Sequence, residues 1–192
     1  MQSQRLKMML LSALFCAIIS VCAQLSISFL PMVPFTMQNF AIALAVIILG
    51  QRYGTLAVLL YILLGAIGVP VFAQFKSGAA VLIGPTGGYL IGYIAAALVM
   101  GMMLKRDNLT VVRAFLANVV GLVIIYAFGV AQLKLVAHLT WNKAIALGMT
   151  PFIAPDLLKI ALASYVGVLV IRRLKAAGLM PSHAQSKAEH AA

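Results

Sequence analysis

Long runs of apolar residues dominate this sequence of 192 residues, and they decide what the chain can fold into. Hydrophobic residues make up 64% of the chain and charged residues only 9%, whereas soluble domains are close to half apolar and a quarter charged. A run of roughly 20 apolar residues is long enough to cross the hydrocarbon core of a bilayer as a helix. The composition therefore excludes a soluble globular protein and predicts an integral membrane protein.

Gly, Pro and charged residues divide the apolar runs into six candidate helices within one domain. The start of the chain imitates a secretory signal, but its apolar run is long enough to span a bilayer, so we expect it to stay as the first helix. The fold class is an all-α integral membrane protein with a six-helix bundle. The expected helices are about 8–30, 37–50, 53–68, 88–104, 110–136 and 156–173, in a membrane domain over 1–175 that is followed by a flexible cytoplasmic tail over 176–192.

The distribution of lysine and arginine predicts the orientation, because short cytoplasmic loops carry an excess of basic residues. With the N-terminus inside, ten basic residues fall on the cytoplasmic side, three fall outside, and Lys159 stays in the membrane region. Both termini are therefore expected in the cytoplasm. The net charge of +11 is scattered in this way rather than gathered into a patch for nucleic acid.

The outer connections predict a pocket that opens outward. The helices expected at 37–50 and 53–68 are only about 14 to 16 residues long, fewer than a bilayer requires. The missing length has to come from outer segments that are rich in Pro, Gly and aromatic residues. Irregular backbone survives at membrane depth only where protein or a water-filled cavity satisfies it. We therefore expect irregular extracellular loops over an outward-facing pocket that takes up a solute.

Asp156 is the one acid at or near the membrane core, and Lys159 follows it at i+3 on the same helix face. One interpretation is a structural ion pair near the interface. The other is that both side chains face the pocket and bind a polar ligand, as ionisable residues inside membranes usually do. The spacing favours the second interpretation and leaves the first open.

Three further motifs carry polar or small residues. "VLIGPTGGYLIGY" lacks the Lys-Ser or Lys-Thr of a phosphate loop. It predicts a turn and then a helix start with Thr86 as a possible cap. Its glycines leave one helix face bare, either for close packing or for a flat ligand ring beside Tyr89. "VPFTMQN" predicts either a helix cap or a lid over the site. Ala13 and Ala17 form a small-residue face that allows close helix packing.

The sequence contains no His-Glu metal pair, no paired acids, no Ser/His/Asp set and no ATP-binding motif. We therefore expect no enzymatic activity, no metal and no cofactor. Active transport by this chain would have to be powered from elsewhere.

Three stretches, "GVPVFAQFKSGAAVLIGPTGGYLIGY", "VPFTMQNFAIALAVIILG" and "PDLLK", resemble the BioY family, the substrate-binding (S) components for biotin of energy-coupling factor (ECF) transporters. The resemblance covers nearly the whole chain in order. It implies a six-helix protein of the bacterial cytoplasmic (inner) membrane that binds a vitamin from outside. It also implies partners, namely a membrane coupling subunit and two ATP-hydrolysing subunits, although some members are reported to work without them.

The resemblance implies biotin as the ligand and gives roles to the residues quoted above. Asp156 would accept from the ureido N–H groups, and Lys159 would donate to the ureido carbonyl or to the carboxylate. Lys76 or backbone N–H groups would otherwise hold the carboxylate, and Ala13 and Ala17 would dock to the coupling subunit. The rest of the expected site consists of Thr86, Gly87, Gly88 and Tyr89 around the bicycle, with Phe35, Thr36 and Gln38 closing over it.

Two alternatives belong to other functional classes. A self-sufficient, proton-coupled carrier of biotin or a related vitamin would use Asp156 as a titrating group. Uphill uptake by the purified chain alone in liposomes, without ATP, distinguishes it from a coupled subunit. A membrane-embedded enzyme or assembly factor is disfavoured because the sequence offers no catalytic constellation.

Overall fold

The computed structural model describes residues 2–27, 32–104 and 109–177 of the chain, with side chains from residue 4 onward. The expected tail over 176–192 falls almost entirely outside these residues. The end of the first expected helix and the basic connection at 105–108 also lie outside them.

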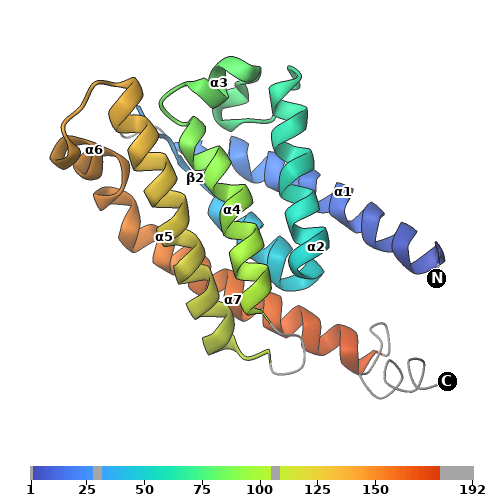
Figure 1. The fold of residues 1–192 in the computed structure, drawn as a ribbon. Helices are drawn as coiled ribbons and strands as arrows, with labels where there is room; N and C mark the ends of the chain where they lie inside the picture. Colours follow the sequence, from blue (N-terminus) through green and yellow to red (C-terminus); the bar gives the residue numbers. More distant parts are fainter. Residues whose placement is uncertain (1, 28–31, 105–108, 178–192) are drawn as a thin grey trace.

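The described chain is a bundle of long helices with short elements gathered at one end (Figure 1). The long helices are α1 (Gln2–Gln24), α2 (Gln38–Ala66), α4 (Gly87–Met103), α5 (Val111–Val136) and α7 (Ile153–Ala176). The short elements are the strands β1 (Ser26–Ile27) and β2 (Phe35–Thr36), the helices α3 (Ala79–Ile83) and α6 (Trp141–Gly148), and the 3₁₀ helices η1 (Ala73–Phe75) and η3 (Thr150–Phe152).

Helix α2 is a hairpin of two arms rather than one straight helix. Gly50 has non-helical angles (φ 79°, ψ −178°), in a region that glycine reaches more readily than residues with a Cβ. A Cβ on Gly54 would lie 2.8 Å from Val46 Cα, whereas residues eight apart on one straight helix are separated by about 12 Å. The chain therefore reverses at Gly50, and the two arms correspond to the helices expected at 37–50 and 53–68.

Length and apolarity make these helices suitable for crossing a membrane. Four helical stretches qualify by length and composition, namely Gln4–Gln24, Gln38–Ala66, Val111–Val136 and Trp141–Ala176, and α4 is a shorter apolar helix. The third of these stretches and α4 agree closely with the expected helices at 110–136 and 88–104. Large apolar side chains such as Leu10, Leu63 and Val123 point outward from the bundle, as lipid-facing residues would.

One expectation about the outer end is wrong. The first helix was expected to run to residue 30, but α1 ends at Gln24, whose side-chain amide donates to Phe72 O and accepts from Phe75 N. The chain then turns so that Ser26 pairs with Thr36, because apolarity alone does not keep a segment helical. The outer segments combine irregular backbone with the short helices α3, α6, η1 and η3.

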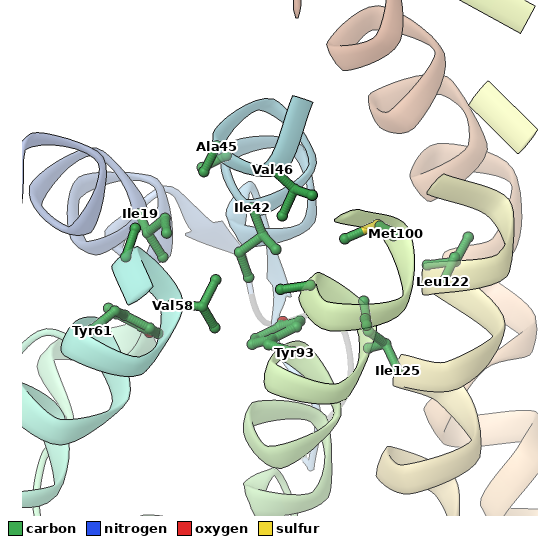
Figure 2. Close-up of a cluster of buried hydrophobic side chains, with 14 of the residues drawn as sticks. Ile19, Ile42, Ala45, Val46, Val58, Tyr61, Tyr93, Met100, Leu122 and Ile125 are labelled. Atoms are coloured by element: carbon green, nitrogen blue, oxygen red, sulfur yellow. The ribbon is translucent and has the colours of Figure 1, made fainter. Parts of the chain in front are cut away.

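The hydrophobic core lies where α1, both arms of α2, α4 and α5 meet. Figure 2 shows Ile42 and Val46 of the first arm between Val58 of the second arm and Met100 of α4. Helix α4 packs along α5, α1 packs along α2, and α7 packs against both α2 and α5. Tyr61 has no exposed surface, so the bundle is closely filled around its centre.

The bundle has two chemically different ends. In Figure 1 the start of α1 and the end of α7 lie at the same end, at lower right, while α3 and α6 lie at the opposite end. The end that holds the start of α1 and the end of α7 carries Arg5, Arg172 and Arg173. The opposite end holds the short elements of the three outer segments.

We predict that Gly54→Leu destabilises the bundle by about 3 kcal/mol, because its side chain would meet the backbone of the facing arm and force the arms apart. A thermal melt in detergent measures the effect. Ala127→Leu, at an exposed position of α5, is the matched control and should melt like the wild type. Equal melting of the two variants would contradict a close approach of the arms.

Candidate functional site

A cavity lies at the end of the bundle where β2, α3 and α6 gather. Its walls come from β2, the first turn of α2, η1, α3, α4, α5, the end of α6, η3 and α7. The cavity therefore joins segments from both halves of the sequence. Its lining consists of Val33, Pro34, Phe35, Thr36, Gln38, Asn39, Phe72, Ala73, Lys76, Val81, Thr86, Tyr89, Leu90, Tyr93, Ile125, Tyr126, Gly148, Phe152, Asp156 and Lys159.

Asp156 is the buried acid of this cavity, with 4% of its surface exposed. It lies in the first turn of α7, where the positive end of the helix dipole favours a carboxylate. Its Oδ1 accepts from Lys159 Nζ at 2.8 Å. Its Oδ2 accepts from Asn39 Nδ2 at 2.7 Å and from the Tyr126 hydroxyl at 2.8 Å. A buried charge is tolerated only when it is paired and hydrogen-bonded, and three donors meet that need.

Lys159 is equally buried, with 6% of its surface exposed, and it joins α7 to the first outer segment. Besides Asp156, its Nζ donates to the carbonyl of Thr36 at 2.6 Å. The same nitrogen lies 3.4 Å from the centroid of the Phe35 ring, within the range of a cation–π contact. The ammonium thus holds strand β2 over the cavity.

A second set of hydrogen bonds fixes the start of α2 beneath β2. The Thr36 hydroxyl donates to Gln38 Oε1 at 2.9 Å, and Gln38 Nε2 donates to the Tyr61 hydroxyl at 2.6 Å. The Tyr61 ring meets the Phe72 ring edge-on, with centroids 5.6 Å apart. These contacts tie both arms of α2 to two outer segments.

Aromatic side chains form much of the cavity wall. The Tyr89 hydroxyl donates to the carbonyl of Gly148 at 2.7 Å, and its ring fills the space where a Cβ on Gly129 would stand. Tyr93 lies one turn further along α4 on the same face. Phe72 and Phe152 complete the apolar surface. The cavity thus combines a buried ion pair with walls suited to a flat, largely apolar molecule.

The structure brings most of the predicted site residues to this cavity. Seven of them line it, namely Phe35, Thr36, Gln38, Thr86, Tyr89, Asp156 and Lys159. Lys76 also lines the cavity, and its side chain is exposed.

Gly87 and Gly88 are not among the lining residues, so their expected contact with a ligand ring gains no support. A Cβ on Gly88 would collide with the backbone of Phe128 in α5, and one on Gly87 would collide with the carbonyl of Leu82. Both glycines permit close packing of the chain, which is the simpler reading of the motif.

Sequence reasoning missed three polar residues of the site. Asn39 is part of the "VPFTMQN" motif but was given no role at the site, and Tyr93 and Tyr126 were not singled out. A signal was present for both tyrosines: Tyr93 follows Tyr89 at i+4, and Tyr126 is a phenol within an apolar run.

Ala13 and Ala17 lie on the exposed side of α1. Leu10 and Leu14 are exposed on the same helix, so this face is open to a neighbour. Within residues 2–27, 32–104 and 109–177, no group of three His, Cys, Asp or Glu side chains is placed to hold a metal ion.

Similarity to known proteins extends over the whole length of the helix bundle. Residues 1–176 match the model of the BioY family. The biotin transporter BioY of Thermotoga maritima is 44% identical over 163 residues, which cover 85% of this chain and 95% of that protein. The probable biotin transporter BioY of Pyrococcus horikoshii is 42% identical over 165 residues, covering 86% of this chain and 94% of that protein. A crystal structure of the S-component for biotin from an ECF-type ABC transporter is also similar, with a TM-score of 0.80 and 27% identity over 91% of this chain and 94% of that one.

We predict that Lys159→Met destabilises the protein by about 3–5 kcal/mol, because it leaves the carboxylate of Asp156 buried without its cation. Hydrogen exchange at residues 35–37 should also speed up, since the ammonium no longer holds the carbonyl of Thr36. Melting in detergent and exchange mass spectrometry measure the two effects. Lys134→Met, which removes a cation stacked on Trp141, is the control. Unchanged exchange at 35–37 would contradict the role given to Lys159.

Proposed function

The chain belongs to the BioY family, and we propose that it is the membrane subunit that binds biotin at the outer face for uptake. The main support for this proposal is the buried pair of Asp156 and Lys159 in a cavity with aromatic walls. The protein is a multi-pass membrane protein. It binds and delivers its ligand without changing it chemically.

The chemistry of biotin fits the polar centre of the cavity. Its ureido ring offers N–H donors and one carbonyl acceptor side by side. Asp156 accepts from an N–H group. Lys159 has three N–H bonds, of which Asp156 and Thr36 receive two. The third is directed to the ureido carbonyl, because the ammonium lies 2.8 Å from the carboxylate that reads the adjacent N–H.

The remaining parts of biotin find matching surroundings. Its flat bicycle lies among Tyr89, Tyr93 and Phe72, whose rings bury apolar surface. Its carboxylate lies toward Lys76, an exposed lysine at the rim. Phe35 and Thr36 close over the ring system.

We also propose the orientation and the partners. The end with the short elements faces outward, and both termini are cytoplasmic in a bacterial inner membrane, which the basic residues at the other end support. Ala13 and Ala17 dock to the membrane coupling subunit of an ECF module, whose two ATP-hydrolysing subunits power delivery. Their exposure supports this docking, because small residues let a partner helix approach closely.

We predict that Asp156→Asn weakens biotin binding at least about 30-fold. The variant loses the negative charge that attracts the ureido N–H group, and it leaves Lys159 buried without its counter-charge; truncating such a pair costs about 2–5 kcal/mol. Titration calorimetry on detergent-purified protein measures the affinity. Asn118→Ala, a buried amide outside the cavity lining, is the control and should bind like the wild type. Tight binding by folded Asp156→Asn would show that the assigned site is wrong.

We further predict that Ala13→Trp with Ala17→Trp prevents co-purification with the coupling subunit while biotin affinity stays within about twofold, because both residues lie outside the cavity lining. Ala127→Trp places the same bulk at an exposed alanine of α5 and should co-purify normally. Normal co-purification of the double variant would exclude this face as the docking surface.

A further inference from the structure

The side-chain amide of Asn39 forms a hydrogen bond through its nitrogen, whereas its oxygen has no hydrogen-bond partner. It lies in the first turn of α2 and lines the cavity. Its Nδ2 donates to Asp156 Oδ2 at 2.7 Å, and this bond fixes the amide, because the reverse orientation would set oxygen against oxygen. Its Oδ1 is buried and accepts no hydrogen bond. Asn39 therefore lines the cavity with an amide of fixed orientation, and the oxygen of that amide is not satisfied by the protein.

This unsatisfied acceptor is distinguished by its position. Among the described residues, three buried side-chain polar atoms lack a partner: Asn39 Oδ1, Thr55 Oγ1 and Asn118 Oδ1. Of these, only Asn39 belongs to the cavity lining. Leaving a buried acceptor unpaired is unfavourable, so a donor on a bound ligand would relieve that cost. The oxygen has almost no surface accessible to water, so a donor that forms a hydrogen bond to it meets little competition from solvent.

The neighbouring carboxylate cannot easily serve both donors of a cyclic urea. A carboxylate has about four acceptor positions, and Asp156 already accepts from Lys159, Asn39 and Tyr126. Roughly one position is left, whereas a cyclic urea carries two N–H donors. A second acceptor is needed beside Asp156, and Asn39 provides one because its amide is bonded directly to that carboxylate.

We infer that Asn39 is a specificity-determining residue, whose Oδ1 accepts one ureido N–H of the ligand while Asp156 accepts the other. The inference rests on the proposed function, because it assumes a cyclic urea in this cavity. It goes beyond that function by requiring that both N–H groups are read. A site built to bond a donor rejects an analogue that lacks it, so replacing either N–H should be penalised.

The first test changes only the ligand. Two biotin analogues, each with one ureido N–H replaced by oxygen, are compared with biotin on the wild-type protein by calorimetry. Each analogue should bind at least about tenfold more weakly, since each leaves a buried acceptor without its donor. An analogue that binds as tightly as biotin would show that only one N–H is read and would overturn the inference. Failure of the wild type to bind biotin at all would instead overturn the proposed function, and the inference with it.

The second test assigns the acceptor. In Asn39→Ala, discrimination against one of the two analogues should fall to within about twofold while discrimination against the other persists. For each analogue, the ratio of its dissociation constant to that of biotin is compared between the variant and the wild type. A uniform loss of affinity caused by a displaced Asp156 cancels in this ratio. Asn118→Ala is a closely matched control, because Asn118 is also a buried asparagine that donates to a side chain, Ser164, and has an unpaired Oδ1. It should keep both ratios. Unchanged ratios in Asn39→Ala would assign the second acceptor elsewhere and overturn the inference.

Discussion

The site depends on the ion pair between Asp156 and Lys159, which lies in an apolar bundle that could not hold either charge alone. Desolvating a charge is costly, and the attraction within a pair offsets that cost only when further hydrogen bonds satisfy both groups. Here the carboxylate also accepts from Asn39 and Tyr126, and the ammonium also donates to Thr36. Four segments of the chain are thereby drawn to one point at the start of α7.

This requirement explains why the two ends of the bundle differ. Below the pair, α4 and α5 pack through small residues: a Cβ on Gly92 would lie 3.1 Å from Ile125 Cα, and Gly121 receives the side chain of Met100. Such packing leaves no room for a ligand. Around the pair, the cavity walls include tyrosines and short outer elements. The backbone groups of these elements form hydrogen bonds to one another or to nearby side chains; for example, the Gln132 side chain donates to the carbonyls of Leu82 and Gly84. Polar groups are thus concentrated where the bundle opens.

Features that depend on residues close in sequence were predicted, whereas features that depend on contacts between distant segments were not. Helices over 88–104 and 110–136 follow from runs of apolar residues, and the Asp156–Lys159 pairing follows from an i, i+3 spacing; both were predicted. The end of α1 at Gln24 and the Asn39–Asp156 bond depend on segments that are distant in sequence, the latter 117 residues apart, and neither was predicted. The "GPTGGY" motif predicted the turn correctly, but Gly88 packs against Phe128 and Gly87 against Leu82, and neither lines the cavity.

The polar centre is arranged so that a ligand adds hydrogen bonds without replacing those that hold the fold. Lys159 has one N–H bond beyond the two given to Asp156 and Thr36, Asp156 has about one acceptor position left, and Asn39 Oδ1 is unpaired. One ligand carbonyl and two ligand N–H groups would complete this set, and that is the pattern of a cyclic urea. On the proposed function, binding therefore keeps β2 attached to α7, because the same ammonium holds the strand and the ligand together. On the same proposal, the ligand stabilises the buried pair further, so the two charges that the bundle has to neutralise also recognise the ligand.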